Sequence, residues 1–203
     1  MTKAQKTLKE KKAFKDEIEN CFQKAESEEI WRSSEIRLEK MYQDYEELPK
    51  GVKAHTDSFI FPAAAIYLAA KEFSQEKAYS IIQGVMKELS LKRGESFNRM
   101  VRMPGGKSLF LKMWDVISHK MFSEDAGFKN VFYPKKKGEF KMDITQCPYS
   151  TYLSELGCPE LTSLFCKSDE YSYGNLDGLM FTRTSTIGAG GTLCDFKLEK
   201  IAK

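Results

Sequence analysis

Four of the five cysteines in this chain of 203 residues lie in its second half: Cys147, Cys158, Cys166 and Cys194. Cys147 and Cys158 each directly precede a proline, which is favoured at the first position of a helix because it has no N–H group to leave unpaired. Each is therefore expected at or beside a helix N-terminus, where partial positive charge and free N–H groups lower the pKa of a thiol. This pattern indicates a nucleophilic thiolate, and the alternative is a small apolar side chain that starts a helix.

A thiol and a carboxylate also lie one helical turn apart. In a predicted helix over residues 159–170, a rotation of about 100° per residue places Cys166 and Asp169 on one flank of the apolar stripe. The pair would line a cleft, or it is a buried thiol beside a surface carboxylate. Glu155 and Glu160 are nearby in the sequence, and carboxylates here would act as general bases or bind a substrate amine.

The C-terminal stretch adds an arginine and a glycine-rich turn before Cys194 and Asp195. Arg183 alternates with apolar neighbours on a predicted strand, so its side chain points either into a cavity or to solvent. An inward guanidinium would bind a carboxylate through a bidentate fork. The turn over residues 188–191 could offer N–H groups to an anion, but it does not match the phosphate-loop or dinucleotide patterns. A tight hairpin explains it more simply.

Metal and histidine chemistry have little support in the sequence. The four cysteines are separated by ten, seven and 27 residues and include no CxxC pair. Such spacing is a poor match to structural zinc sites. The two histidines are His55, in a predicted linker, and His119, on a predicted helix. This low count weakens a Ser-His-Asp or Cys-His assignment, and we expect no metal and no cofactor.

These residues are expected to be positioned by an α+β fold, in which an N-terminal helical half packs with a C-terminal antiparallel sheet of about four strands. Hydrophobic periodicity predicts helices over residues 3–47 with a break near Ser27, and over 59–72, 75–91 and 109–122. Strands are predicted over 128–133, 139–144, 179–187 and 193–199, with two short helices over 148–156 and 159–170. Pro49-Lys-Gly marks a linker and Met103-Pro-Gly-Gly a helix breaker. We therefore expect a helical arm over residues 1–50 and a single domain over residues 51–203.

The charge balance and the distribution of apolar residues limit which binding partners and which cellular location we expect for this protein. The net charge of +3 gives no argument for nucleic acid or an anionic membrane, and no apolar run approaches the length of a membrane-spanning helix. The N-terminus is basic without a following apolar stretch, so we expect no secretory signal, a frayed terminus and a cytoplasmic location. The odd number of cysteines agrees with reduced thiols. The expected partner is a small-molecule substrate, and any homo-oligomer would form through the N-terminal helix.

Several short motifs together resemble the L-2-amino-thiazoline-4-carboxylic acid hydrolase family. They are Cys147-Pro-Tyr149, Glu155-Leu-Gly-Cys158-Pro-Glu-Leu161, Phe165-Cys166 with Asp169, Phe181-Thr-Arg183 followed by Thr186, Gly190-Gly191, and Cys194-Asp195-Phe196. The helical pattern from Phe59 to Gly106 is compatible, so the resemblance covers about residues 59–198. It implies hydrolytic opening of a small cyclic amidine ring, with an N-carbamoyl amino acid as the product.

For such a substrate, the candidate residues fall into two groups. The candidate catalytic residues are Cys158, Cys166, Asp169, Cys194 and Asp195. The candidate substrate-binding residues are Cys147, Tyr149, Glu155, Glu160 and Arg183. Arg183 would bind the substrate carboxylate, a carboxylate side chain would bind the amidinium, and either a thiolate or an activated water would attack the amidine carbon. The alternatives are a non-catalytic domain that senses a small molecule or metal, and a helical adaptor that dimerises through residues 1–50.

Overall fold

The N-terminal segment forms three helices where the sequence predicts one with a single break. The computed structural model describes residues 1–201, and these helices are α1 (Lys3–Lys9), α2 (Lys12–Cys21) and α3 (Lys24–Asp44). The predicted break near Ser27 is misplaced, because the chain turns at Phe22 and Gln23. Ser27 lies inside α3, where its hydroxyl group donates to the Ile18 carbonyl over 3.3 Å.

Helix α1 is docked against α3, so the prediction of a frayed terminus is wrong. Ala4 and Leu8 are almost fully buried, and the Gln5 amide donates to Glu35 of α3 over 2.7 Å. Thr2 caps the helix by accepting from the Gln5 N–H group. Residues 1–50 thus contribute to the helical core and do not stand apart from it.

The chain after Pro49, predicted to be a linker, begins a continuous run of helical segments. Helix α4 (Lys50–His55), the π-helix η1 (Thr56–Ile60) and α5 (Phe61–Lys71) follow one another without a gap. Almost every residue of α5 is buried, which explains its run of alanines and aliphatic side chains. His55 is buried within α4 and is therefore held in place.

Gly51 allows α4 to pack directly on the backbone of the turn η2 (Glu124–Ala126), because a Cβ atom at this position would overlap the Asp125 carbonyl. We expect Gly51→Ala to destabilise the fold by about 1–3 kcal/mol, as overpacking does. Gly84 lies in a helix with no neighbouring atom within 4 Å of an added Cβ, so Gly84→Ala is the matched control. It should stabilise the protein by about 0.5–1 kcal/mol. Urea unfolding of both variants measures the difference, and equal effects would contradict this account.

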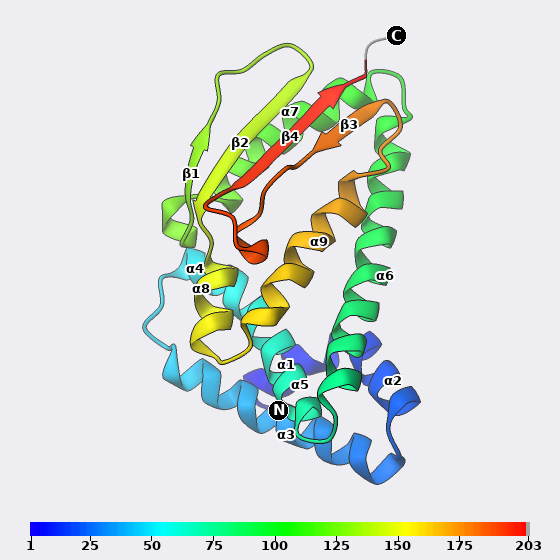
Figure 1. The fold of residues 1–203 in the computed structure, drawn as a ribbon, viewed down its shortest axis with the longest axis vertical. Helices are drawn as coiled ribbons and strands as arrows, with labels where there is room; N and C mark the ends of the chain where they lie inside the picture. The colour runs from blue at the N-terminus through cyan, green and yellow to red at the C-terminus, as the bar shows by residue number, and fades with distance from the viewer. Residues whose placement is uncertain (202–203) are drawn as a thin grey trace.

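Helix α6 (Gln75–Val101) connects the two halves of the molecule (Figure 1). It runs ten residues beyond its predicted end, and the predicted breaker then separates it from α7 (Gly106–Met121). Gly105 adopts a left-handed conformation with φ of 74°, which favours glycine and allows the sharp turn into α7. The N-terminal part of α6 joins the helical core, and its C-terminal end joins the core beneath the sheet.

The second half is a four-stranded antiparallel sheet, which confirms the predicted α+β class. Its order is β1 (Lys129–Phe132), β2 (Glu139–Gln146), β4 (Cys194–Lys200) and β3 (Leu179–Thr182). Alternate residues of β2 and β4 are buried against α7, which lies behind the sheet in Figure 1. Between β2 and β3 come α8 (Pro148–Glu155), the 3₁₀ turn η3 (Pro159–Leu161) and α9 (Thr162–Tyr173).

The last hairpin departs from its prediction. Strand β3 ends at Thr182, five residues before the predicted end, and residues 183–193 form a loop that contains the 3₁₀ turn η4 (Ile187–Ala189). The Asp195 side chain accepts from the N–H groups of Thr184 and Ser185, which takes these groups out of strand pairing. The loop therefore folds toward α9, as the small coil beside α9 in Figure 1 shows.

Two hydrophobic cores result, one among the helices and one beneath the sheet. Helix α9 spans both, because Leu164 packs in the first core and Tyr173 in the second. The aromatic ring of Tyr149 contacts both cores from α8. Within residues 1–201, no helix is both long and apolar enough to cross a bilayer.

Candidate functional site

The two cysteine–proline pairs start helices as predicted, but their thiols are not activated. Cys147 is the N-cap of α8 and Cys158 the N-cap of η3. Burial raises the pKa of Cys147 to about 11, although the N–H groups of Ser150 and Tyr149 act in the opposite direction. Burial, with the nearby charge of Glu160, raises the pKa of Cys158 to about 12. At both positions, the rise in pKa caused by loss of hydration therefore exceeds the lowering expected from the helix N-terminus.

Cys166 is the thiol that its surroundings favour as a thiolate. It lies in the body of α9 and receives a hydrogen bond from the Cys194 thiol, which is the main cause that lowers the pKa of Cys166 to about 7. The charge of Arg183, the Thr186 hydroxyl group and the Gly188 N–H group add to this effect and together outweigh burial. These four groups come from β4 and the loop after β3, so the thiolate depends on tertiary contacts.

Cys194 is the protonated partner in this pair of thiols. It is the first residue of β4 and is buried, and its sulfur accepts from the Ile187 N–H group over 3.2 Å. The hydrogen bond to Cys166, followed by burial, raises the pKa of Cys194 well above that of an ordinary thiol. Above a pH of about 7 the pair therefore consists mainly of a Cys166 thiolate and a Cys194 thiol.

Arg183 points inward and connects α9 to β4 through hydrogen bonds and an ion pair. Its side chain is 6% exposed and its Nη2 atom lies 2.7 Å from the Asp169 carboxylate. Nη1 donates to the Cys166 carbonyl over 3.0 Å, and Nε to the Asp195 carbonyl over 3.3 Å. The guanidinium is therefore occupied by internal partners and joins α9 to β4. The side chain of Asp169 is 37% exposed, so this carboxylate also faces solvent.

Asp195 shapes the loop that covers Cys166. Its carboxylate accepts from the Thr184 N–H group over 2.9 Å, the Ser185 N–H group over 2.7 Å and the Thr184 hydroxyl group over 3.0 Å. Burial alone would raise the pKa of Asp195, but these donors hold it below its usual range. The structure thus uses this side chain to hold backbone in place.

Tyr149 packs beside the thiols and is oriented by His55. The Tyr149 ring lies 4.8 Å from that of Phe165, and its hydroxyl oxygen lies 3.1 Å from His55 Nδ1. His55 Nε2 lies 2.9 Å from the Met121 carbonyl, which can only accept, so Nε2 carries the proton and Tyr149 donates to Nδ1. Burial lowers the pKa of His55 and raises that of Tyr149, so both side chains are neutral.

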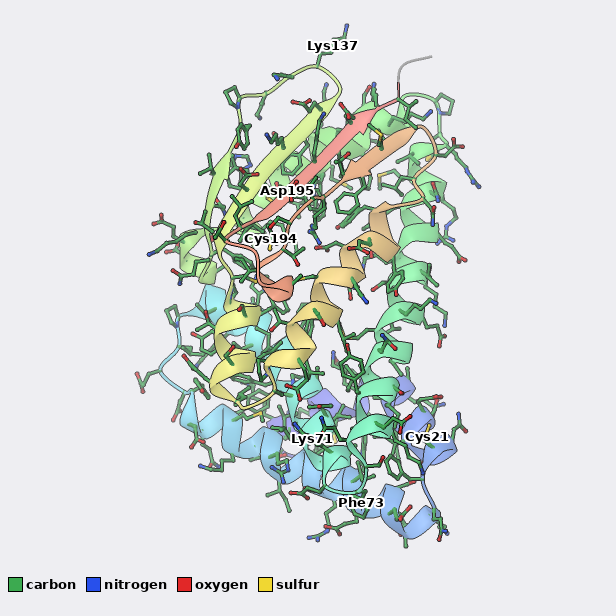
Figure 2. All side chains as sticks on the ribbon, in the orientation of Figure 1. Cys21, Lys71, Phe73, Lys137, Cys194 and Asp195 are labelled. Atoms are coloured by element: carbon green, nitrogen blue, oxygen red, sulfur yellow. The ribbon has the colours of Figure 1, made fainter. Side chains whose placement is uncertain are left out.

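Three of the predicted site residues lie outside this cluster. Glu155 accepts from the Tyr45 hydroxyl group, and Cys158 is buried in the helical core. Glu160 pairs with Lys71 over 2.9 Å and accepts from Tyr67 over 2.5 Å. Figure 2 shows Lys71 at the helical end of the molecule, well apart from Cys194 at the lower end of the sheet. The fold therefore brings together Cys147, Tyr149, Cys166, Asp169, Arg183, Cys194 and Asp195.

Arg93 is a residue near the site that the sequence did not single out. It is exposed on α6, which packs along α9, and its positive charge opposes the raised pKa that burial imposes on Tyr149 and Tyr173. Among residues 1–201 it forms no ion pair with a carboxylate within 4 Å. In the sequence it is one of several charged residues on a long helix, so only packing distinguishes it.

Gly188 leaves space for the Cys166 sulfur. A Cβ atom at Gly188 would lie 2.8 Å from Cys166 Sγ, and the backbone of Gly188 has no positive φ that would exclude alanine. We expect Gly188→Ala to displace the sulfur from its donors and to slow alkylation of Cys166 by roughly tenfold, equivalent to about 1.4 kcal/mol. Peptide-resolved iodoacetamide labelling measures the rate. Ala189→Ser, at an exposed neighbour, is the control, and equal rates in both variants would contradict the packing argument.

Comparison with known proteins agrees with the sequence motifs. The model of the family described as L-2-amino-thiazoline-4-carboxylic acid hydrolase matches residues 53–198, which include every residue of the cluster. A search of curated proteins and a search of solved structures returned no match. In the part of the chain that the structure describes, no three His, Cys, Asp or Glu side chains converge as metal ligands. The match extends over well more than half of the sequence, and the chain belongs to the L-2-amino-thiazoline-4-carboxylic acid hydrolase family.

Proposed function

We propose that this protein is a hydrolase that opens a small cyclic amidine ring bearing a carboxylate, such as L-2-amino-thiazoline-4-carboxylate. The product would be an N-carbamoyl amino acid. The observation that carries the proposal is the half-buried Cys166, held as a thiolate by Cys194, Arg183, Thr186 and Gly188 in a member of this family. A thiolate of this kind is a suitable nucleophile for an electrophilic carbon.

The first step would be attack of Cys166 Sγ on the amidine carbon of the protonated ring. The C=N electron pair moves onto nitrogen and gives a neutral tetrahedral adduct. Asp169 is the carboxylate placed to bind the amidinium, because it is one turn from Cys166 and partly exposed. The adduct then collapses with cleavage of the ring C–S bond, and the ring sulfur takes a proton from the Cys194 thiol. An isothiouronium remains bonded to Cys166.

Water would complete the reaction. It adds to the same carbon and transfers a proton to the Cys194 thiolate, which restores that thiol. The new tetrahedral species expels the Cys166 thiolate, and the resulting protonated urea releases its proton to solvent. The sum is substrate plus one water, and both cysteines end in their initial states. In this cycle Cys194, which is protonated in the resting pair, acts first as the proton donor and then as the proton acceptor.

Recognition of the ring carboxylate is assigned to Arg93 in this proposal. Arg183 is the cation predicted for this role from the sequence, but its guanidinium already binds Asp169 and two carbonyl groups. We therefore propose that Arg183 is a positioning residue and that Arg93 supplies the exposed charge. Arg93→Gln should raise KM far more for rings with a carboxylate than for rings without one.

The direct test uses the purified full-length chain with 2-amino-thiazoline rings that carry or lack the 4-carboxylate. Thiol release and product mass report hydrolysis, and intact-protein mass after rapid quenching reports the adduct on Cys166. Turnover of the carboxylate-bearing ring with a Cys166-linked intermediate is expected. A bound small molecule in native mass spectrometry without turnover on any ring would instead favour the sensor alternative.

The pH dependence of alkylation is a second test of the thiolate. Because the pKa of Cys166 is lowered to about 7, its thiolate is present above this pH and is lost as the pH falls below it. About half of Cys166 should be reactive at pH 7, against about 1% for a thiol of pKa near 9. Cys21 is an internal reference, because burial and Glu17 raise its pKa. A Cys166 profile that coincides with that of Cys21 would exclude the thiolate.

We further propose a cytoplasmic location and, if the protein forms a homo-oligomer, contact through its N-terminal helices. A reducing compartment such as the cytoplasm would keep the five cysteines as free thiols. A homo-oligomer through the N-terminal helices would have to use their exposed faces, since Ala4 and Leu8 are already covered within the chain. Deletion of residues 1–50 would also remove part of the core, so mass measurements on the intact chain are the suitable test.

A further inference from the structure

The cluster places the sulfurs of Cys166 and Cys194 against the same short turn, η4, with Cys147 nearby. The Cys194 thiol donates to the Cys166 sulfur, and the same loop turn, η4, contacts both. The Ile187 N–H group lies 3.2 Å from Cys194 Sγ, and Gly188 packs against Cys166 Sγ. Cys21 lies among the helices at the lower end of the molecule in Figure 2, apart from Cys194 at the lower end of the sheet, and Cys158 is buried in the helical core.

We propose that Cys166 and Cys194 form a reversible disulfide when a hydroperoxide oxidises Cys166, and that this bond switches the enzyme off. The switching part of the inference rests on the proposed function, because Cys166 is the nucleophile of that reaction. The disulfide itself rests on the packing of both sulfurs against adjacent residues of η4, Ile187 and Gly188, and on the partial exposure of Cys166.

The chemistry balances with the hydroperoxide as oxidant. The Cys166 thiolate attacks the distal oxygen of ROOH, the O–O bond breaks, and ROH leaves after taking up a proton. Cys166 is now a sulfenic acid. The Cys194 sulfur then attacks the Cys166 sulfur, the S–OH bond breaks, and the hydroxide leaves as water with the proton of Cys194. Two thiols have lost two electrons to one peroxide, and a dithiol reductant reverses the bond by exchange.

Cys194 is favoured over Cys147 as the second thiol. Cys147 lies near enough for its charge to affect the pKa of Cys194. The hydrogen bond that stabilises the Cys166 thiolate, however, comes from Cys194. Disulfide formation needs a sulfur separation of about 2.05 Å, so the two sulfurs must approach from hydrogen-bond contact. Cys194 is the first residue of β4 and directly follows the loop over residues 183–193, so the approach displaces the end of a strand and not its middle. Cys147 is held at the start of α8 by the buried Pro148.

The test treats the native full-length protein with stoichiometric hydrogen peroxide and maps its disulfides by mass spectrometry without reduction. We expect the free-thiol count to fall from five to three and one linked peptide pair to join Cys166 and Cys194. Dithiothreitol should restore all five thiols. Cys194→Ser should form no such bond and should accumulate sulfenic acid at Cys166, which dimedone traps. Cys194→Ala repeats this test if the serine variant is unstable, and Cys21→Ser is the control that should still lose two thiols.

Outcomes for the disulfide and for the hydrolase can be separated. A bond between Cys147 and Cys166, or sulfinic acid at Cys166 in the wild type without any disulfide, would overturn the inference. A Cys166–Cys194 bond in a protein that hydrolyses no ring would support the redox pair and reject the proposed function. In an active enzyme, peroxide should reduce turnover at least tenfold, and dithiothreitol should restore it; unchanged turnover with the bond in place would overturn the switch.

Discussion

Replacement of Cys166 by serine is expected to reduce hydrolysis by about a thousandfold or more, because removal of a nucleophile costs at least this much where it acts within a coupled group. A serine hydroxyl group has nearly the shape of the thiol, so it should keep the contact with Gly188 and the fold of the loop. It is not ionised near neutral pH, and the donors that favour the thiolate would have no anion to stabilise. Steady-state kinetics with the carboxylate-bearing ring measures the loss.

Two further cysteine variants make this experiment specific. Cys21→Ser alters a thiol among the helices at the lower end of the molecule and should keep wild-type turnover (Figure 2). Cys158→Ala alters a buried thiol in the helical core and should lower stability while the remaining folded protein keeps its turnover. If Cys166→Ser retains turnover within a few-fold of wild type, a water activated by Asp169 becomes the better mechanism.

Arg183→Met should destabilise the protein by about 3 kcal/mol, toward the lower end of the range for breaking a buried ion pair. The arginine is 6% exposed, whereas Asp169 is 37% exposed and keeps part of its hydration, which moderates the loss. The carbonyl groups of Cys166 and Asp195 would also lose their donors. The loss of positive charge should raise the pKa of Cys166 and shift its alkylation profile to higher pH.

The partner variant separates stability from thiol activation. Asp169→Asn removes the opposite charge but leaves the Arg183 charge beside Cys166, so it should destabilise the fold without raising the pKa of Cys166. Urea unfolding of the two single variants and the double variant gives their coupling. Additive losses, or equal shifts of the alkylation profile in both variants, would contradict the assignment of Arg183 as the positioning cation.

Local periodicity was sufficient for the features that lie within one element. The placement of Cys166 and Asp169 on one flank of α9 follows from helix geometry, and the contact of Asp169 with Arg183 beside Cys166 agrees with it. The breaker before α7 and the strand pair β1–β2 were also predicted, because glycine, proline and alternating side chains act over a few residues. The C-terminal motifs indicated the family, which the match over residues 53–198 confirms.

Burial reversed two of the sequence-based expectations. The helix starts at Cys147 and Cys158 are where they were predicted, yet the pKa of each thiol is raised. The extent to which a thiol loses water depends on residues distant in the chain, and no local pattern reports it. The same limit applies to the basic N-terminus, where Ala4 and Leu8 find partners on other helices.

The sequence by itself determined the α+β class, most of the helices and strands, the family and the set of residues from which a site is built. Only the tertiary structure decided that Cys166 is the thiolate, that Cys194 is its protonated partner and that Arg183 is used internally. It also separated Cys158, Glu155 and Glu160 from the cluster. The reason is physical: propensity and periodicity act over a few residues, whereas the charge state of a thiol depends on every donor and charge that folding brings around it.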